Sequence, residues 1–401
     1  MRVKAIIKLD NFKENIKSVR MRIGDNRLIC VPVKADAYGH GAFKIAEASL
    51  SAGADYLGVA AVAEGVELRR GGIKTPILIF SQPNPDEIPQ IIKENLIPFI
   101  SDIEFASILN EQVTATNKRF AEVLGSMAQN VQLPVHIKID TGMGRMGCSV
   151  EESLDLARHI TSCQGLKLAG IATHLAVSDS TEERDINYTY EQLSRFKNAI
   201  DAIRAEGIDP GIVHAANSGA VILHPGAWLD MVRPGILLYG YKAAEENDIH
   251  TKGTLLQKAE HIKELSNHKP VIVKPVMEFR TSVMLIKKIK KGDSVSYGRT
   301  WTADKDTFIA VLSAGYADGI PRLASNKWQA VINGETYPIT GRICMDQCCV
   351  DLGAEPRVKR WDEAVIFGGQ AKSAAALAEV TGTIPYEITC NVSKRVAREY
   401  A

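Results

Sequence analysis

The chain has 401 residues, which at roughly 150 residues per domain predicts two or three domains. Its 48 Lys and Arg residues against 47 Asp and Glu residues leave a net charge of +1, so the overall charge offers no attraction to nucleic acid or to anionic membranes. A hydrophobic fraction of 45% with 24% charged residues is typical of a folded globular protein and excludes a largely disordered chain.

The sequence predicts a protein of the cytoplasm. No apolar run is long enough to span a bilayer, and Lys and Arg residues are spread through the first 22 residues, which does not suit a signal peptide. The seven cysteines form no CxxC pair and no Cys/His cluster with metal-ligand spacing. We therefore expect reduced thiols, no membrane partner, no nucleic-acid partner and no metal site.

The first 240 residues alternate short β-branched apolar runs with longer amphipathic stretches, which is typical of parallel βα units. Eight such units in one domain of this length indicate an α/β fold, the (β/α)8 or TIM barrel. A capping box from Ser149 to Glu152 precedes an apolar stripe at helical spacing and predicts a helix there. The predicted barrel strands are residues 28–33, 56–60, 76–80, 96–100, 134–140, 168–174, 211–215 and 231–237.

The pattern changes after the barrel. Residues 243–269 are charged and poor in apolar residues, and we leave open whether they form a surface helix or a mobile insert. The sequence beyond them is rich in β-branched residues and predicts a mostly-β C-terminal domain. We place the barrel at residues 10–245 and the C-terminal domain at residues 246–401. The strands predicted in this domain are residues 271–273, 282–289, 308–312, 329–332, 348–352 and 364–367.

Lys34 stands at the carboxyl end of an apolar strand, where barrel enzymes carry their reactive groups. Burial at that place lowers the pKa of a lysine and leaves a neutral amine that can form a Schiff base with a carbonyl cofactor. A lysine whose amine extends to solvent is the alternative, and this segment alone does not decide between the two.

Residues 31–41, Val-Pro-Val-Lys-Ala-Asp-Ala-Tyr-Gly-His-Gly, resemble the pyridoxal-phosphate lysine segment of bacterial alanine racemases. The resemblance implies a barrel followed by a β domain that the N-terminal strand in residues 1–9 joins. It also implies pyridoxal 5'-phosphate as cofactor, racemisation of alanine to supply D-alanine for peptidoglycan, and a homodimer with composite active sites. Eight further segments resemble the family in the family's order, namely residues 138–147, 173–179, 216–218, 233–236, 296–299, 314–319, 341–347 and 385–388.

The resemblance assigns two catalytic bases. Lys34 binds the cofactor and is one base, and Tyr297 of the second domain is the other, on the opposite face of the substrate α-carbon. Arg233 faces the ring nitrogen of the cofactor and, because an arginine keeps its proton at ordinary pH, leaves that nitrogen unprotonated. His174 connects Arg233 to Tyr297.

The cofactor phosphate is expected in the loops after the seventh and eighth strands, a common phosphate site in barrels. Read alone, Asn217 and Ser218 equally suit a helix cap. By resemblance, the hydroxyls of Tyr38, Ser218 and Tyr386 and the amides of Gly235 and Ile236 bind the phosphate, and Asn217 also binds the cofactor.

Residues 142–147 satisfy the dinucleotide pattern G-x-G-x-x-G, but no acidic residue follows about 20 residues later, so we reject that function. The resemblance instead implies that Arg145 binds the phenolic oxygen of the cofactor and the carboxylate of the substrate. Lys138 matches a lysine that can be carbamylated and then holds Arg145. Pairing of Lys138 with Asp140, or simple solvation, is the alternative.

Three more residues are assigned to the substrate side: Met345 and Asp346 border it from the partner subunit, and Tyr316 lines the channel leading to it. Two other functions are weighed. A non-catalytic pyridoxal-phosphate carrier would not need Tyr297, and a decarboxylase of related architecture would place an acid where Arg233 stands. Whether serine or larger amino acids are also substrates stays open.

Overall fold

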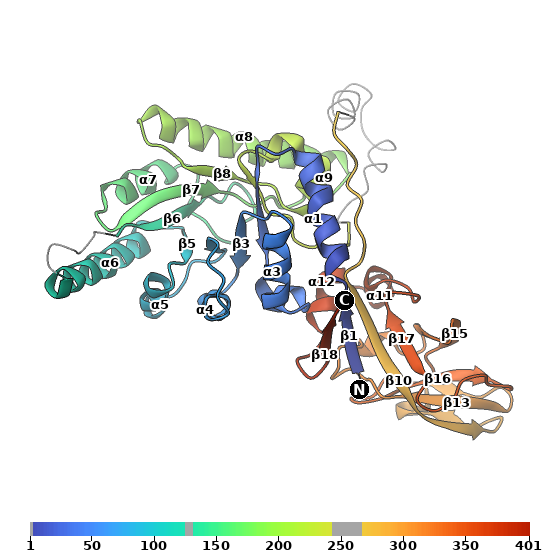
Figure 1. The fold of residues 1–401 in the computed structure, drawn as a ribbon. Helices are drawn as coiled ribbons and strands as arrows, with labels where there is room; N and C mark the ends of the chain where they lie inside the picture. The colour runs from blue at the N-terminus through green and yellow to red at the C-terminus, as the bar shows by residue number, and fades with distance from the viewer. Residues whose placement is uncertain (1–2, 125–130, 243–266) are drawn as a thin grey trace.

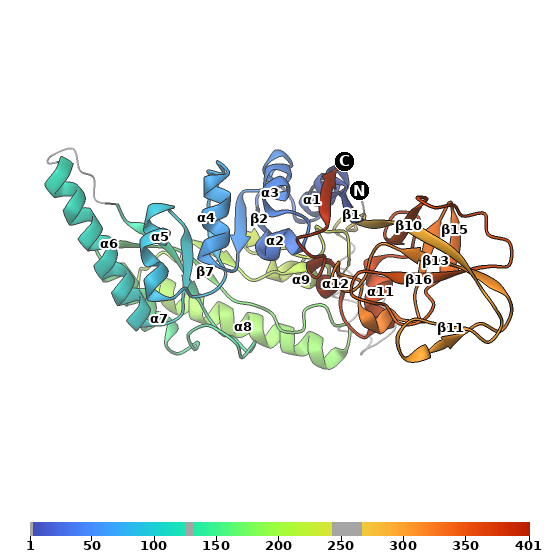
Figure 2. The same ribbon diagram turned by 90° about the horizontal axis from the view of Figure 1, so that it is seen from below.

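The computed structural model describes residues 3–124, 131–242 and 267–401 (Figure 1). Figure 2 shows a barrel with its surrounding helices at one end of the molecule and a β-rich body at the other, with α12 (Pro385–Cys390) where the two meet. In the described part of the chain, no helix is both long and apolar enough to cross a membrane.

Eight parallel strands form the barrel, which confirms the predicted fold. They follow the order β8-β7-β6-β5-β4-β3-β2-β9. The ring is nearly closed between β8 and β9, where the amide of Asp230 donates to the carbonyl of Val213 (3.0 Å) and the amide of Arg233 to that of Ala216 (2.8 Å). The strands are β2 (Leu28–Pro32), β3 (Tyr56–Val59), β4 (Ile77–Ile79), β5 (Ile97–Ile100), β6 (Leu133–Lys138), β7 (Leu166–Ala172), β8 (Ile212–His214) and β9 (Met231–Val232).

Helices pack against the outside of the barrel through one apolar face each. In α8, for example, Phe196, Ala199, Ile200 and Ile203 recur at helical spacing and are buried. The predicted capping box forms before α7, because the amide of Glu152 donates to Ser149 Oγ (3.1 Å) and the amide of Ser149 to Glu152 Oε2 (3.0 Å). The helices are α1 (Leu9–Ile23), α2 (Lys34–Tyr38), α3 (Ala42–Ser51), α4 (Val62–Arg70), α5 (Ile88–Lys93), α6 (Ile103–Leu124), α7 (Ser153–Ser162), α8 (Glu183–Ala205) and α9 (Ser218–Leu223).

The C-terminal part is mostly β, as predicted. Its main sheet has the order β15-β14-β17-β10-β1-β18, and β13 extends it by pairing with β10 and β16. The N-terminal strand β1 pairs antiparallel with β10 and parallel with β18. The strands are β1 (Val3–Ile7), β10 (Met277–Ile289), β11 (Ser294–Val295), β12 (Trp301–Thr302), β13 (Thr307–Leu312), β14 (Gln329–Ile332), β15 (Glu335–Pro338), β16 (Cys348–Gly353), β17 (Glu363–Phe367) and β18 (Ala397–Tyr400), with helix α11 (Ala374–Thr381) before α12.

The strand predicted at residues 271–273 is wrong. This segment is extended but is in no sheet, because side chains of α1 take its backbone hydrogen bonds. The amide of Ile272 donates to Ser18 Oγ (2.8 Å), and the amide of Lys274 donates to Asn15 Oδ1 (2.8 Å). Of the stretch 243–269, residues 243–266 lie outside the described residues, and so does the predicted boundary at 245/246.

Candidate active site

A cavity of about 600 Å³ opens at the carboxyl ends of the barrel strands. Most of the residues that the sequence assigned to the cofactor line it. They come from strands, loops and α12, which are far apart along the chain. The assigned residues that line the cavity are Lys34, Tyr38, Lys138, Arg145, His174, Asn217, Ser218, Arg233, Gly235 and Tyr386.

Lys34 begins α2, a turn of unusual handedness. The four residues after it, from Ala35 to Tyr38, all have φ of 53°, so α2 is a left-handed turn made without glycine. Such a conformation costs roughly 1–2 kcal/mol per residue. Glu64 Oε1 supports it by accepting the amide of Ala35 (2.6 Å), and Asp36 Oδ1 by accepting the amide of Ala42 (2.8 Å). Residue types did not predict this turn, because alanine normally avoids positive φ.

The surroundings of Lys34 favour a neutral amine. Burial lowers the pKa of Lys34, and the nearby positive charge of Arg145 lowers it further, while Glu64 acts in the opposite direction. A neutral amine is the form that attacks a carbonyl carbon.

A cradle of hydroxyl and amide groups lines the cavity just beyond the ends of β8 and β9. Ser218 Oγ accepts the amides of Gly235 (2.8 Å) and Leu237 (3.3 Å). A Cβ on Gly235 would lie 2.9 Å from Tyr38 Oη, so a side chain at this position would fill the cradle. Tyr386 shares a hydrogen bond with Ser218, and burial raises its pKa to about 12, so its hydroxyl stays protonated.

This cradle suits a phosphate group. Among the described residues, no Asp or Glu lines the cavity, whereas Lys34, Lys138, Arg145 and Arg233 do. Asn217 is the N-cap of α9, with Oδ1 accepting the amide of Ala220 (3.1 Å), which agrees with the helix-cap alternative for this residue. Ile236 is buried and does not line the cavity. The cofactor-binding roles of both residues stay predictions.

Arg233 is completely enclosed, and its guanidinium is fixed by three hydrogen bonds. It donates to His214 Nδ1 (2.6 Å) and to the carbonyls of Thr173 (2.7 Å) and Ala215 (3.1 Å). Burial lowers the pKa of Arg233 to about 10, which still leaves it charged at neutral pH. The relay from Arg233 through His174 to Tyr297 stays a prediction, since the histidine that contacts the guanidinium here is His214.

His214 and its neighbour His136 were not singled out from the sequence. His214 Nδ1 accepts from Arg233, so the proton of this imidazole is on Nε2, which donates to His136 Nδ1 (2.8 Å). Burial lowers the pKa of His136 to about 3 and that of His214 well below its ordinary value, so both rings are neutral. Two polar residues among the apolar positions of β6 and β8 were the available signal.

Lys138 lies at the end of β6 with 6% of its surface exposed. Burial lowers its pKa well below the ordinary value, and the charges of Arg233 and Arg145 add to the effect. Among the described residues no ion pair joins it to Asp140, whose carboxylate instead accepts the amides of Gly142 (2.9 Å) and Arg145 (3.1 Å). The alternative for Lys138, an ion pair with Asp140 or simple exposure to solvent, is therefore not what the described residues show.

Four predicted residues lie on the β domain and outside this cavity. Tyr297 is 70% exposed, Met345 53% and Tyr316 42%. Asp346 is partly exposed and pairs with Arg395 (2.9 Å). A single chain thus brings the cofactor-side residues together but leaves the predicted second base on an open surface.

Comparisons with known proteins agree along the whole chain. The family model described as "Alanine racemase, N-terminal domain" matches residues 7–243, and the one described as "Alanine racemase, C-terminal domain" matches residues 276–400. An alanine racemase of Treponema denticola is 48% identical over 401 residues, covering 98% of this chain and 97% of its own. An alanine racemase of Desulforamulus reducens is 39% identical over 397 residues, which cover 99% of this chain and 98% of that protein.

Solved structures agree as well. The alanine racemase of Clostridium difficile 630 superposes with a TM-score of 0.86 at 32% identity, covering 100% of this chain and 96% of its own. That of Bacillus anthracis with bound L-Ala-P has a TM-score of 0.83 at 29% identity, covering 100% and 95%. With both halves of the sequence and the whole fold matched, the chain belongs to the alanine racemase family.

Proposed function

We propose that this chain interconverts L-alanine and D-alanine with pyridoxal 5'-phosphate and two bases, Lys34 and Tyr297. Family membership supports the reaction and the cofactor. One observation carries the residue assignments. Lys34, whose pKa is lowered, and the cradle around Ser218 line the same cavity. When bound, the cofactor makes the α-hydrogen of an attached amino acid acidic by delocalising the charge that its removal leaves.

The chain's own groups hold and orient the cofactor. We assign its carbonyl carbon to Lys34 Nζ and its phosphate to Ser218, Tyr38, Tyr386 and the amides of Gly235 and Ile236, beside Asn217. Arg233, fixed by His214 and two carbonyls, presents a guanidinium that does not release its proton at neutral pH. It therefore leaves an opposing ring nitrogen without a proton, which limits how much charge the ring withdraws.

Two groups on opposite faces then move the proton. The amine of Lys34 acts on one face, removing the proton as the neutral amine and returning it as the ammonium, and Tyr297 acts on the other, removing it as the phenolate and returning it as the phenol. Arg145 binds the substrate carboxylate. Burial favours the neutral amine of Lys138, the form that carbamylation requires, and the carbamate would place a negative charge near Arg145 and Arg233, whose charges already act on Lys138.

We further propose a homodimer in which the β domain of one protomer completes the cavity of the other. The exposure of Tyr297, Met345 and Tyr316 on a surface away from the cavity supports this arrangement. In it, Met345 and Asp346 border the substrate and Tyr316 lines the channel that leads to it.

The two rival functions fit less well. A carrier has no use for Tyr297, and a decarboxylase of this architecture would carry an acid at the position of Arg233. We propose that the enzyme works in the cytoplasm, where its seven free cysteines stay reduced, and supplies D-alanine for peptidoglycan.

Incubation of the loaded protein with L-alanine tests the proposal. D-alanine is the expected product; release of carbon dioxide would indicate the decarboxylase, and no reaction the carrier. The same assay across a panel of amino acids, serine included, determines the substrate range. Reduction with borohydride followed by peptide mapping should label Lys34, and a label on another lysine would contradict the assignment.

A further inference from the structure

His40 lies just beyond the left-handed turn and is completely buried. Its Nδ1–H is shared by two carbonyls of that turn, those of Ala37 (3.0 Å) and Tyr38 (2.9 Å). Because both partners are acceptors, this nitrogen carries the proton and Nε2 does not. Among the described residues, Nε2 has no hydrogen-bond partner, so the ring makes its polar contacts only with the turn.

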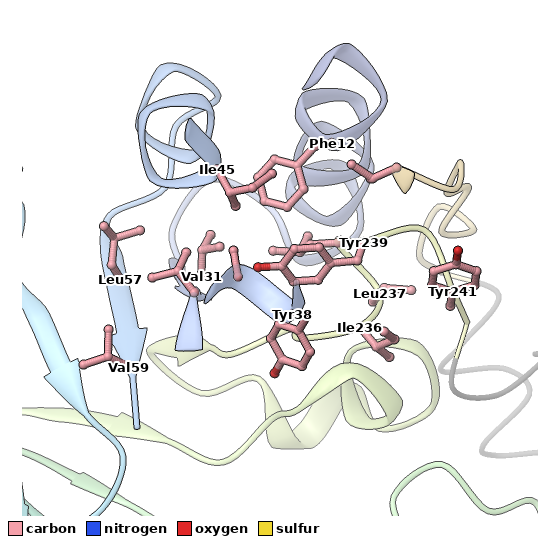
Figure 3. Close-up of a cluster of buried hydrophobic side chains, with 14 of the residues drawn as sticks. Phe12, Val31, Tyr38, Ile45, Leu57, Val59, Ile236, Leu237, Tyr239 and Tyr241 are labelled. Carbon is pink, nitrogen blue, oxygen red and sulfur yellow. The ribbon is translucent and has the colours of Figure 1, made fainter. Parts of the chain in front are cut away.

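The His40 ring packs against a cluster of aromatic side chains that are tilted relative to one another. The His40 ring lies 4.7 Å from the ring of Tyr239, which lies 4.8 Å from the ring of Tyr38 and 5.4 Å from that of Phe12. Figure 3 shows Tyr239 between Phe12 above and Tyr38 below. Tyr239 is itself fixed, since its hydroxyl donates to the carbonyl of Pro32 (2.8 Å), the last residue of β2.

The carbonyl of Tyr38 would be costly to leave unpaired. The carbonyl of Ala37 also accepts the backbone amide of His40 (3.0 Å), whereas the donor to the carbonyl of Tyr38 is Nδ1–H of His40. Tyr38 is buried, and a carbonyl without a partner in such surroundings loses the hydrogen bonds that water would give it. A right-handed turn would direct these carbonyls elsewhere, so a donor that reaches both selects the left-handed one. The burial that lowers the pKa of His40 to about 4 keeps it a single neutral donor at ordinary pH.

We propose that His40 is a positioning residue for the cofactor: its Nδ1–H fixes the left-handed turn, and the turn sets where Lys34 Nζ and Tyr38 Oη meet the cavity. The inference rests on the proposed function in that these two groups bind pyridoxal phosphate. Both line the cavity from the two ends of α2, so a change in the turn moves one relative to the other.

The test compares three variants as loaded enzymes. His40→Leu keeps the bulk but has no donor, whereas His40→Asn places an amide N–H near the position of Nδ1. His159→Leu is the control, because His159 bonds Ser107 on the outside of the barrel (2.9 Å). The dissociation constant for pyridoxal phosphate should rise about tenfold in His40→Leu, recover most of the way in His40→Asn and stay unchanged in the control.

A lower melting temperature in His40→Leu with an unchanged cofactor dissociation constant would overturn the inference and leave only a structural role. Should that variant fail to fold, ¹⁵N NMR of histidine-labelled wild-type protein gives the answer, with the His40 signal assigned from the Asn variant. A proton on Nδ1 is expected, and a proton on Nε2 would overturn the inference. The proposed function fails separately, if borohydride does not label Lys34 in the wild-type protein.

Discussion

Arg233 keeps its positive charge although it is buried. Its guanidinium donates to the neutral imidazole of His214 and to the carbonyls of Thr173 and Ala215, and His214 in turn donates to His136. None of these groups takes up its proton at neutral pH, so the side chain presents a fixed positive charge to the cavity.

Replacing Arg233 with glutamate should change the reaction's outcome. A carboxyl group shares a proton with the ring nitrogen of the cofactor and so strengthens charge withdrawal by the ring. The deprotonated substrate then lasts longer, and a proton can be added to the cofactor's imine carbon instead of the substrate α-carbon. We expect racemisation to fall about 10²-fold or more and slow release of pyruvate from alanine to appear. Arg233→Gln, which is neutral, is the control and should lose activity without forming pyruvate. A folded, cofactor-loaded Glu variant that forms none would show that Arg233 does not face the ring.

The buried histidines should make the protein less stable in mild acid. His40 and His136 have pKa values of about 4 and about 3 in the folded protein, below the ordinary value of 6.5, because burial disfavours the charged ring. Between the folded and the ordinary pKa, the unfolded chain binds more protons than the folded protein does. The free energy of unfolding therefore falls as the pH falls from about 6.5 towards about 4.

Urea unfolding at about pH 7.5 and at about pH 5 measures this effect, to which each histidine contributes up to about 1.4 kcal/mol per pH unit. His40→Asn removes one of the two groups and should flatten the dependence. An equal dependence in the variant and the wild type would show that His40 is charged, or exposed, in the folded state.

Among the elements, the turn α2 depends on the glycine that ends it. Gly39 has φ of 82°, and a Cβ there would lie 2.1 Å from the carbonyl oxygen of Thr389 in α12. Gly24, after α1, has nearly the same φ of 83° but nothing within 4 Å of its Cβ position. Gly39→Ala should therefore destabilise the protein by more than Gly24→Ala does. The Gly24 variant loses only about 1 kcal/mol because of its backbone conformation, whereas the Gly39 variant also clashes with Thr389.

Urea unfolding measures the free energy of unfolding of both variants. The difference between their losses of stability reports the contact between α2 and α12. We also expect Gly39→Ala alone to weaken binding of pyridoxal phosphate, since α2 carries Lys34. Equal losses of stability in the two variants would mean that α12 yields to the added methyl group.

The sequence predicted the elements of the barrel better than their local geometry. The apolar barrel strands reveal themselves by composition, Lys34 by its place at a strand end, and Arg233 by the resemblance of its segment to the family. The handedness of α2 was missed because tertiary contacts from Glu64 and His40, not residue type, impose it. Residues 271–273 were taken for a strand because a β-branched run does not show whether its amides meet a sheet or, as here, the side chains of α1.

At the scale of the whole molecule, the proposed site needs two chains. Lys34 lies in the barrel cavity, and Tyr297 is exposed on the β domain. Lys34→Ala and Tyr297→Phe should each reduce activity about 10³-fold alone. Mixed under subunit exchange, they should recover up to about a quarter of wild-type activity, because half the dimers are mixed and each has one site with both bases. No recovery, with exchange verified by mass, would place both bases in one chain.

The pairing of β1 has a consequence for how the protein is made. This strand is synthesised before the barrel, whereas its partners β10 and β18 are synthesised after the barrel. The barrel can fold while translation continues, but the main sheet of the β domain cannot be completed until β18 has left the ribosome. Every nascent chain therefore carries an unpaired β1 while the barrel is made, and this exposed edge favours association with neighbouring chains on the same message.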